Sequence, residues 1–223
     1  MTSILNIALS DEEKFLVKVL THRDYLDCDG IRLLYQSVGC EKLFELCEQN
    51  KISSIAADAL IRCCGREKLS SHWLEVFEDV DNRIGQYMLE LEKVATVLAS
   101  KNIPLVALKN SGITKALYPH YGASPMGDID VLVRKPDFRR AHKILVENGF
   151  TFKFRSPLEE ENLDKAEQGG GSEYAVTLPN GNQLWLELQW RPVAGRWIRP
   201  DQEPGADELM AHSVQVEGSN VRL

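Results

Sequence analysis

The chain has 223 residues, 43% of them hydrophobic, which is enough to bury the core of one large domain or two small ones. Its formal net charge of -7 argues against a large nucleic-acid-binding surface, because binding to the phosphate backbone depends on clustered Lys and Arg. No run of about 18 apolar residues exists that could span a membrane. Acidic residues from Asp11 onward interrupt the N-terminal segment before it could form a signal peptide core. We therefore expect a globular, cytoplasmic protein.

The N-terminal third holds all five cysteines of the chain: Cys28, Cys40, Cys47, Cys63 and Cys64. They form no CxxC pair, and no histidine cluster has the spacing of metal ligands. We expect these cysteines to be reduced thiols in the core or on the surface.

Residues 1–100 form the first predicted region. From residue 11 to about residue 100, apolar residues recur at spacings of three and four, most clearly between Ile84 and Leu98. This pattern predicts a layer of helices.

The remaining residues, 101–223, are predicted to form a second region with strands. Leu105–Leu108 is an apolar strand candidate, and Lys109–Gly112 is a predicted polar turn. A short helix is expected next, through Ile113, Ala116 and Leu117.

Further strands and a helix follow. Residues 128–133 alternate as a strand does, and Pro136-Asp137 opens a predicted helix that ends at Asn148-Gly149. The apolar stripe of this helix is predicted to consist of Phe138, Ala141, Leu145 and Val146.

A strand is expected at residues 150–154, followed by a mobile loop at 156–172 that includes one helical turn. Asn180-Gly181 lies between two alternating segments, which predicts a hairpin. A second hairpin is expected at residues 214–221. Because the chain ends within this strand, we expect the natural protein to be longer.

Asp128 and Asp130 carry the main chemical signal. Strand alternation places both carboxylates on one face, about 6 to 7 Å apart, opposite the apolar residues of the strand. Two neighbouring carboxylates repel each other unless a cation lies between them, and their hard oxygens suit magnesium or manganese. The alternative is a polar edge strand with two solvated acids.

Two other segments support the catalytic interpretation. The turn Lys109–Gly112 offers an ammonium, the hydroxyl of Ser111 and backbone N–H groups at the start of a helix, which together could bind a triphosphate. Glu187 lies on a later strand, and if this strand neighbours Asp128 and Asp130, the three acids could bind metal and deprotonate an attacking hydroxyl. The alternatives are a plain turn and a solvated sheet residue.

The order of these elements resembles the DNA polymerase beta type nucleotidyltransferase superfamily. Residues 105–150, with the Asp-Ile-Asp strand at Asp128, closely resemble an uncharacterised bacterial nucleotidyltransferase family, and LWLELQW around Glu187 resembles its later acidic strand. The resemblance covers about residues 80–223. It implies an α+β fold, with a helical N-terminal portion and a small mixed-sheet nucleotidyltransferase core.

The resemblance also implies roles for individual residues. Asp128, Asp130 and Glu187 would be the catalytic metal ligands, with Mg²⁺ or Mn²⁺ as the cofactor. Lys109, Ser111 and Gly112 would bind the NTP, for example ATP. The roles of these six residues are assigned by matching their positions to the motifs of the family.

Three positions depart from the family pattern: Asn110 in place of Gly, Ser124 in place of Arg, and Gln189 in place of His. They could alter the phosphate contact, a charge partner, and a substrate or metal contact, respectively. All three metal carboxylates are kept.

The sequence thus predicts magnesium-dependent transfer of a nucleoside monophosphate from an NTP to a hydroxyl or similar acceptor on a small molecule, a peptide or a protein. One alternative is a non-catalytic module that binds a nucleotide or partner. Another is an Asp-x-Asp glycosyltransferase, although that fold would need a larger parallel sheet before the motif.

Overall fold

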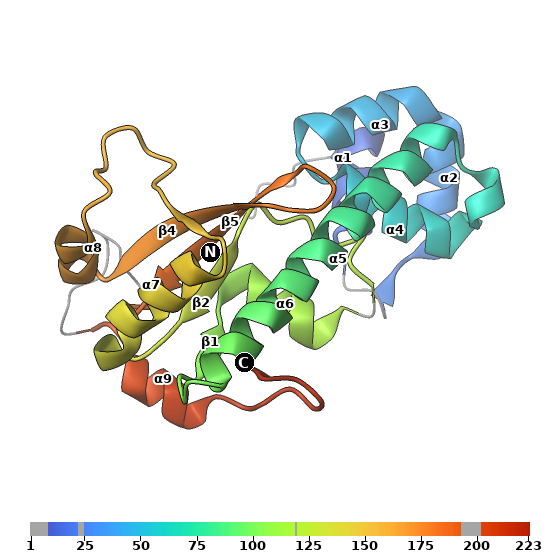
Figure 1. Cartoon of the computed structure of the whole chain (residues 1–223). Coiled ribbons are helices and arrows are strands. Elements are labelled where there is room, and N and C mark those ends of the chain that lie inside the picture. The colour runs from blue at the N-terminus through green and yellow to red at the C-terminus, as the bar shows by residue number, and fades with distance from the viewer. Residues whose placement is uncertain (1–8, 22–24, 119, 193–201) are drawn as a thin grey trace, which may run out of the picture. The chain divides into compact units, whose positions relative to one another are not determined.

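The computed structural model describes residues 9–21, 25–118, 120–192 and 202–223 (Figure 1). Most of the N-terminal segment considered as a signal peptide lies outside these residues. The chain divides into two compact units. The helical unit comprises the described residues of Met1–Ile84 and His120–Pro125, and the sheet unit those of Gly85–Pro119 and Met126–Leu223. The expected domain boundary after residue 100 stays a prediction.

Helices form the helical unit, as the three- and four-residue spacing predicts. Their bounds are α1 Asp11–Val19, α2 Cys28–Val38, α3 Cys40–Gln49, α4 Ser53–Cys64, the 3-10 turn η2 Arg66–Lys68, and the first part of α5 Ser71–Ala99. At the start of α1, the Ser10 hydroxyl accepts a hydrogen bond from the Glu13 N–H, and the Glu13 carboxylate accepts one from the Ser10 N–H. This capping box satisfies amide groups that the helix itself cannot pair.

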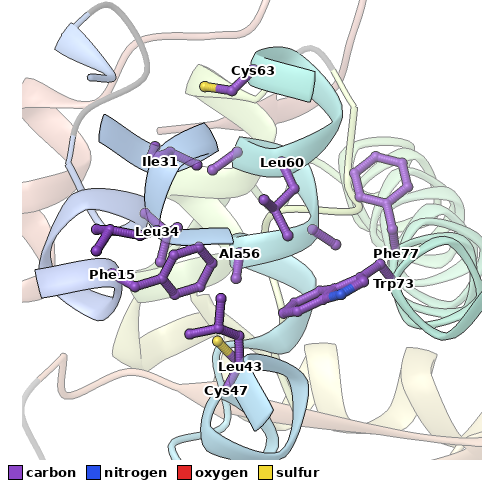
Figure 2. Close-up of a cluster of buried hydrophobic side chains, with 13 residues drawn as sticks. Phe15, Ile31, Leu34, Leu43, Cys47, Ala56, Leu60, Cys63, Trp73 and Phe77 are labelled. Carbon is purple, nitrogen blue, oxygen red and sulfur yellow. The ribbon is translucent and has the colours of Figure 1, made fainter. Parts of the chain in front are cut away.

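The core of the helical unit draws side chains from all five helices (Figure 2). Phe15, Leu43 and Leu60 are fully buried there. Trp73 lies edge-on to Phe44, with ring centroids 4.9 Å apart and the planes at 89°, which is a favourable aromatic geometry. Each helix therefore contributes one apolar stripe to a shared interior.

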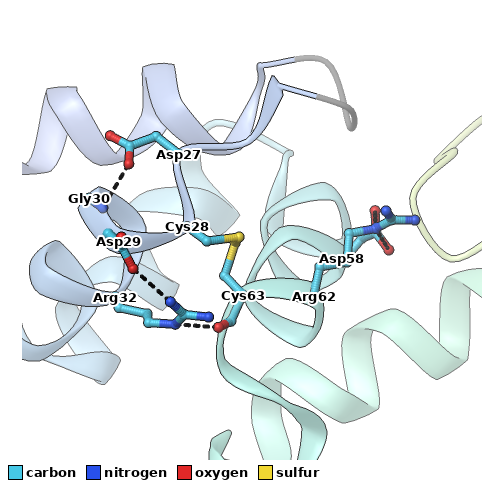
Figure 3. Close-up of a disulfide and its surroundings, with 8 residues drawn as sticks. All are labelled: Asp27, Cys28, Asp29, Gly30, Arg32, Asp58, Arg62 and Cys63. Carbon is cyan, nitrogen blue, oxygen red and sulfur yellow. Dashed lines mark hydrogen bonds and ion pairs between the residues drawn. A yellow bond between two sulfur atoms is a disulfide. The ribbon is translucent and has the colours of Figure 1, made fainter.

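A disulfide joins Cys28 at the start of α2 to Cys63 near the end of α4 (Figure 3). The expectation of five reduced thiols is therefore wrong for this pair. The packing of α2 against α4 brings the two Cα atoms to 4.8 Å, within the range that a disulfide spans. A separation of 35 residues along the chain gave no hint of this approach. Three cysteines are free: Cys40, Cys47 and Cys64.

The sheet unit combines a mixed sheet with helices. Its strands are β1 Leu105–Ala107, β2 Ile129–Leu132, β3 Thr151–Phe152, β4 Gly171–Thr177, β5 Gln183–Gln189 and β6 Val221–Arg222. Its helices are the second part of α5, α6 Lys109–Leu117, the 3-10 turn η3 Lys135–Asp137, α7 Phe138–Glu147, α8 Leu163–Gly169 and α9 Ala206–His212.

The six strands lie in the order β3-β4-β5-β2-β1-β6. Figure 1 labels four of them, β4, β5, β2 and β1. β2 runs parallel to β5, and β1 runs parallel to β6, whereas the other neighbours are antiparallel. α6 packs against β1 and β2, α7 against β3 and β5, and α8 against β4. The expected α+β fold with a small mixed sheet is confirmed.

Several predicted elements are also confirmed. The hairpin at Asn180-Gly181 forms from β4 and β5, and Gly181 adopts a positive φ of 84° in its turn. The second hairpin forms as well, because Val214 and Leu223 exchange two backbone hydrogen bonds. Gly149 follows the end of α7 with a φ of 91°, as a helix C-terminus favours.

The short helix expected through Ile113 and Leu117 is present as α6, but it exposes these residues, and the predicted apolar stripe of α7 is partly wrong. Ile113 and Leu117 of α6 are 49% and 72% exposed, whereas Ser111 and Thr114 are buried. In α7, Val146 is 45% exposed, although the other three residues of its predicted stripe are buried. Short helices that pack through one turn leave some apolar residues on the surface, and single exposed residues of this kind are common.

The predicted loop at residues 156–172 is more ordered than expected. It contains α8, whose start is capped because the side chain of Asn162 accepts hydrogen bonds from the N–H groups of Asp164 and Lys165. Gly170, with a φ of 104°, ends this helix, and the next residue begins β4. Among the described helices, none is both long and apolar enough to cross a membrane.

The core of the helical unit yields a first prediction. Replacing Leu60 by Ala is expected to lower the free energy of unfolding by about 3 kcal/mol, because the truncated side chain leaves a cavity in a packed interior. The matched control is Leu33→Ala in α2, since Leu33 is 66% exposed. Urea unfolding followed by circular dichroism measures the free energy of unfolding of both variants. Equal losses for the two variants would contradict the described packing.

Candidate active site

Asp130 lies in the middle of the sheet. Its strand, β2, is flanked by β5 and β1, and all four residues of β2 are buried. The side chain of Asp130 is only 7% exposed. The alternative of a polar edge strand with solvated acids is therefore wrong for Asp130. Asp128 precedes the strand, and its side chain is 28% exposed.

Glu187 stands directly beside Asp130. The parallel register of β2 and β5 pairs these two residues, so the predicted adjacency of the two strands is confirmed. On the other side of β5, the antiparallel register pairs Glu187 with Glu173. Three adjacent strands thus carry a row of three acidic residues. Carboxylates at facing positions of a sheet repel one another unless cations or protons compensate them.

Lys109 supplies positive charge to this row. Its Nζ lies 2.6 Å from Oδ1 of Asp130 and 3.5 Å from Oε2 of Glu187. Partial burial favours a lower pKa for Lys109, but the hydrogen bond to Asp130 and the charges of both acids outweigh it and raise the pKa. Lys109 is therefore a fully charged partner of the two carboxylates.

The segment around Lys109 differs from the predicted turn. Residues 109–112 form the first turn of α6 rather than a separate loop. Lys109 has a φ of 49°, a conformation that non-glycine residues rarely adopt and that is often found at functional sites. This residue makes the abrupt change of direction from β1 to α6.

Ser111 and Gly112 hold α6 close to the sheet. Ser111 is fully buried, and its Oγ accepts a hydrogen bond of 2.9 Å from the backbone N–H of Asp130. A Cβ atom on Gly112 would lie 2.7 Å from the carbonyl oxygen of Ala107, so only glycine fits this approach. Both residues thus have structural roles. Their proposed contacts with a nucleotide remain predictions.

Gln189, which departs from the family pattern, also contacts Asp130. Its Nε2 donates a hydrogen bond of 3.2 Å to Oδ1 of Asp130, the same oxygen that Lys109 contacts. The side chain is buried, and among the described residues its Oε1 has no hydrogen-bond partner. Gln189 therefore helps to fix the orientation of the Asp130 carboxylate.

Two members of the site escaped the sequence analysis, Arg155 and Glu173. The guanidinium of Arg155 lies 2.6 Å from Oδ2 of Asp128 and 3.0 Å from Oε1 of Glu173. Glu173 also accepts a hydrogen bond of 2.7 Å from the backbone N–H of Arg155. The register of the predicted hairpin could have revealed Glu173, because it faces Glu187. Nothing in the sequence indicated Arg155.

The other two departures are Asn110 and Ser124. Asn110 is exposed in the first turn of α6. Ser124 belongs to the helical unit, where its N–H donates to the carbonyl of Tyr121.

The surroundings of Glu187 favour its protonated form. Burial, followed by a hydrogen bond with Asp130 and the charges of Asp130 and Glu173, raises the pKa of Glu187 to about 7, although Lys109 acts in the opposite direction. Crowded carboxylates share a proton in this way when no metal is bound.

The donors partly fit a magnesium ion. Asp130 and Glu187 provide adjacent, hard carboxylate oxygens in a region with excess negative charge, as Mg²⁺ prefers. Asp128, in contrast, is engaged by Arg155. Among the residues that the structure describes, no group of three or more His, Cys, Asp or Glu side chains is arranged to hold a metal ion. The full triad would require Arg155 to release Asp128.

The raised pKa gives a prediction about stability. The folded pKa of Glu187, about 7, exceeds its ordinary value of 4.5, so folding favours the protonated form. This stabilising contribution is complete below about pH 4.5 and is lost as the pH rises through about 7. In the presence of a chelator, the stability of Glu187→Gln relative to the wild type should therefore rise over this interval, by about 3 kcal/mol.

Thermal and urea unfolding at a series of pH values measure this difference. Glu208→Gln, at an exposed position in α9, is the control and should show a constant difference from the wild type. A constant difference for Glu187→Gln as well would contradict the crowding of the carboxylates.

Comparisons with known proteins identify the family. No curated protein and no solved structure matches the chain. A family profile described as "Uncharacterised nucleotidyltransferase" matches residues 36–223, which is most of the sequence and includes every residue of the site described above. The chain therefore belongs to this family of nucleotidyltransferase enzymes.

Proposed function

We propose that the protein transfers a nucleoside monophosphate from an NTP to an acceptor hydroxyl in a magnesium-dependent reaction. The observation that carries this proposal is the pairing of Asp130 with Glu187 in the centre of the sheet, with Lys109 bound to both. Family membership supports nucleotidyl transfer over the glycosyltransferase alternative. It also favours an enzyme over a non-catalytic binding module.

Asp128, Asp130 and Glu187 would hold the metal, which when bound neutralises phosphate charge and polarises the phosphorus under attack. Manganese could replace magnesium, because both are hard cations that bind carboxylate oxygens. Gln189 and the backbone contact with Ser111 fix the position of Asp130, and a metal would compete with Lys109 for its Oδ1. Asp128 would first exchange its contact with Arg155 for the metal.

The start of α6 would bind the phosphates of the NTP. The unpaired N–H groups of a helix N-terminus attract anions, and Lys109 adds a full positive charge at this point. The hydroxyl hydrogen of Ser111 could be donated to a phosphate, because its oxygen already accepts from Asp130, but this buried side chain would need α6 to shift. Gly112 would allow a close approach of the backbone.

Glu187 would act as the general base. The pairing of Glu187 with Asp130 places this carboxylate beside the proposed metal, where it could accept a proton from an acceptor hydroxyl. The acceptor hydroxyl would lose its proton to Glu187 as its oxygen attacks the α-phosphorus. No covalent intermediate with the protein is required.

The proposal predicts that Asp128→Asn combined with Asp130→Asn abolishes transfer. The two substitutions preserve side-chain volume but remove both negative charges, so activity should fall at least about 100-fold. The assay incubates the full chain with each α-labelled NTP, magnesium and cell extract, and measures transfer of the label. Asp207→Asn, a highly exposed aspartate paired with Arg134, is the matched control.

Thermal unfolding of the double variant checks that it folds. Equal labelling by the wild type and the folded double variant would refute the proposal, as would an absence of labelling by the wild type with all four NTPs.

A further inference from the structure

Arg155 joins two carboxylates of the sheet unit. Its Nη1 donates a hydrogen bond of 2.6 Å to Oδ2 of Asp128, and its Nη2 donates one of 3.0 Å to Oε1 of Glu173. The guanidinium also lies over the ring of Trp185, with 5.7 Å between Cζ and the ring centroid. Such a contact favours a cation. Arg155 is thus held by β4, by β5 and by the residue that precedes β2.

The two carboxylates hold Arg155 in unequal ways. Glu173 accepts the backbone N–H of Arg155 at 2.7 Å and, in addition, hydrogen bonds from both Nε and Nη2 of the side chain. This forked contact fixes the plane of the guanidinium. Asp128 accepts one hydrogen bond, from Nη1. Glu173 is therefore the anchor, and the contact with Asp128 can open while the side chain stays attached to the sheet.

The contact with Asp128 stands in the way of a metal ion. Oδ2 of Asp128 already shares its electrons with an N–H of Arg155. The charge of the guanidinium also repels a second cation on either oxygen of this carboxylate. In the free protein, Arg155 thus compensates Asp128 in the way that Lys109 compensates Asp130. Metal binding at Asp128 requires that Nη1 finds another acceptor.

A phosphate oxygen is the acceptor that suits these N–H groups. Metal ions in phosphoryl-transfer sites are shared by protein carboxylates and phosphate oxygens, so a phosphate would come close to Asp128 and to Nη1. The planar fork of arginine matches phosphate as well as carboxylate. Each nitrogen of Arg155 uses one N–H in the contacts above, and both Nη atoms carry a second. The anchor at Glu173 keeps these donors beside Asp128.

We propose that Arg155 is a phosphate-binding residue that exchanges Asp128 for a phosphate oxygen of the NTP when Asp128 takes up the metal. This inference rests on the proposed function. The exchange couples the two ligands: the free protein binds metal weakly because Arg155 holds Asp128, and phosphate binds tightly once that contact is open.

Binding of Mn²⁺ without nucleotide tests the first half of the exchange. Arg155→Gln should tighten this binding by about 10-fold, because Asp128 is freed and a repelling charge is removed. In the Asp128→Asn background, the same substitution should tighten it by less than about 3-fold, since the contact is already weakened. Electron paramagnetic resonance of free Mn²⁺ measures the affinity without turnover.

Arg134→Gln is the matched control. The side chain of Arg134 is 46% exposed and pairs with Asp207, and that of Arg155 is 40% exposed. The control should leave the affinity for Mn²⁺ unchanged. Arg155→Lys is a second variant, which keeps the charge but cannot form the fork with Glu173 and reach Asp128 together. It should tighten Mn²⁺ binding by a smaller factor than Arg155→Gln.

Binding of inorganic triphosphate in the presence of a chelator tests the second half. This probe carries the phosphates that all NTPs share. Asp128→Asn should tighten its binding by about 10-fold, because the substitution releases Arg155 and removes a repelling charge. With Arg155→Gln already present, the gain should fall below about 3-fold. Isothermal titration calorimetry measures the affinities, and thermal unfolding checks that each variant folds.

The outcomes separate this inference from the proposed function. Equal gains in both backgrounds would indicate a general effect of charge and would overturn the exchange. No gain from Arg155→Gln, or no binding of Mn²⁺ by any of the variants, would overturn it as well. Metal-dependent labelling by the wild type would uphold the proposed function in each of these cases. An absence of such labelling with all four NTPs would instead refute the proposed function.

Discussion

The parallel pairing of β2 with β5 is the constraint on which the site depends. It places two carboxylates, Asp130 and Glu187, side by side in the centre of a sheet. Such a pair is unfavourable unless its charge is compensated. The surrounding side chains meet this requirement: Lys109 contacts both acids, and Gln189 donates a hydrogen bond to one of them. The arrangement therefore has a cost in stability that a purely structural sheet would not need.

Cationic side chains hold both ends of the acidic row. Lys109 binds the Asp130 end, whereas Arg155 binds Glu173 and Asp128. Hydrogen bonds to both acids outweigh partial burial and raise the pKa of Arg155, so it stays charged. A divalent cation at Asp128 would compete directly with this guanidinium.

Strand periodicity made part of the site predictable. Alternation alone placed Asp130 opposite the apolar residues of its strand, and Glu187 opposite the leucines of β5. Glu173 was also within reach, since an Asn-Gly turn fixes the register of a hairpin and this register pairs Glu173 with Glu187. The role of Arg155 could not be predicted, because this residue follows the short strand β3 and the orientation of its side chain depends on tertiary contacts. The same holds for the contact between Cys28 and Cys63, which depends on the packing of α2 against α4.

The junction between β1 and α6 shows why residue type alone does not separate structural from functional roles. Lys109, Ser111 and Gly112 are predicted to bind phosphate. Each of them already has a contact that holds α6 against the sheet. Lys109 binds Asp130, Ser111 accepts the N–H of the same residue, and Gly112 allows the helix to approach Ala107. A substitution at Ser111 would therefore disturb Asp130 as well as any phosphate contact. The proposed metal site and phosphate site form one structural unit, and their contributions to catalysis are not expected to be additive.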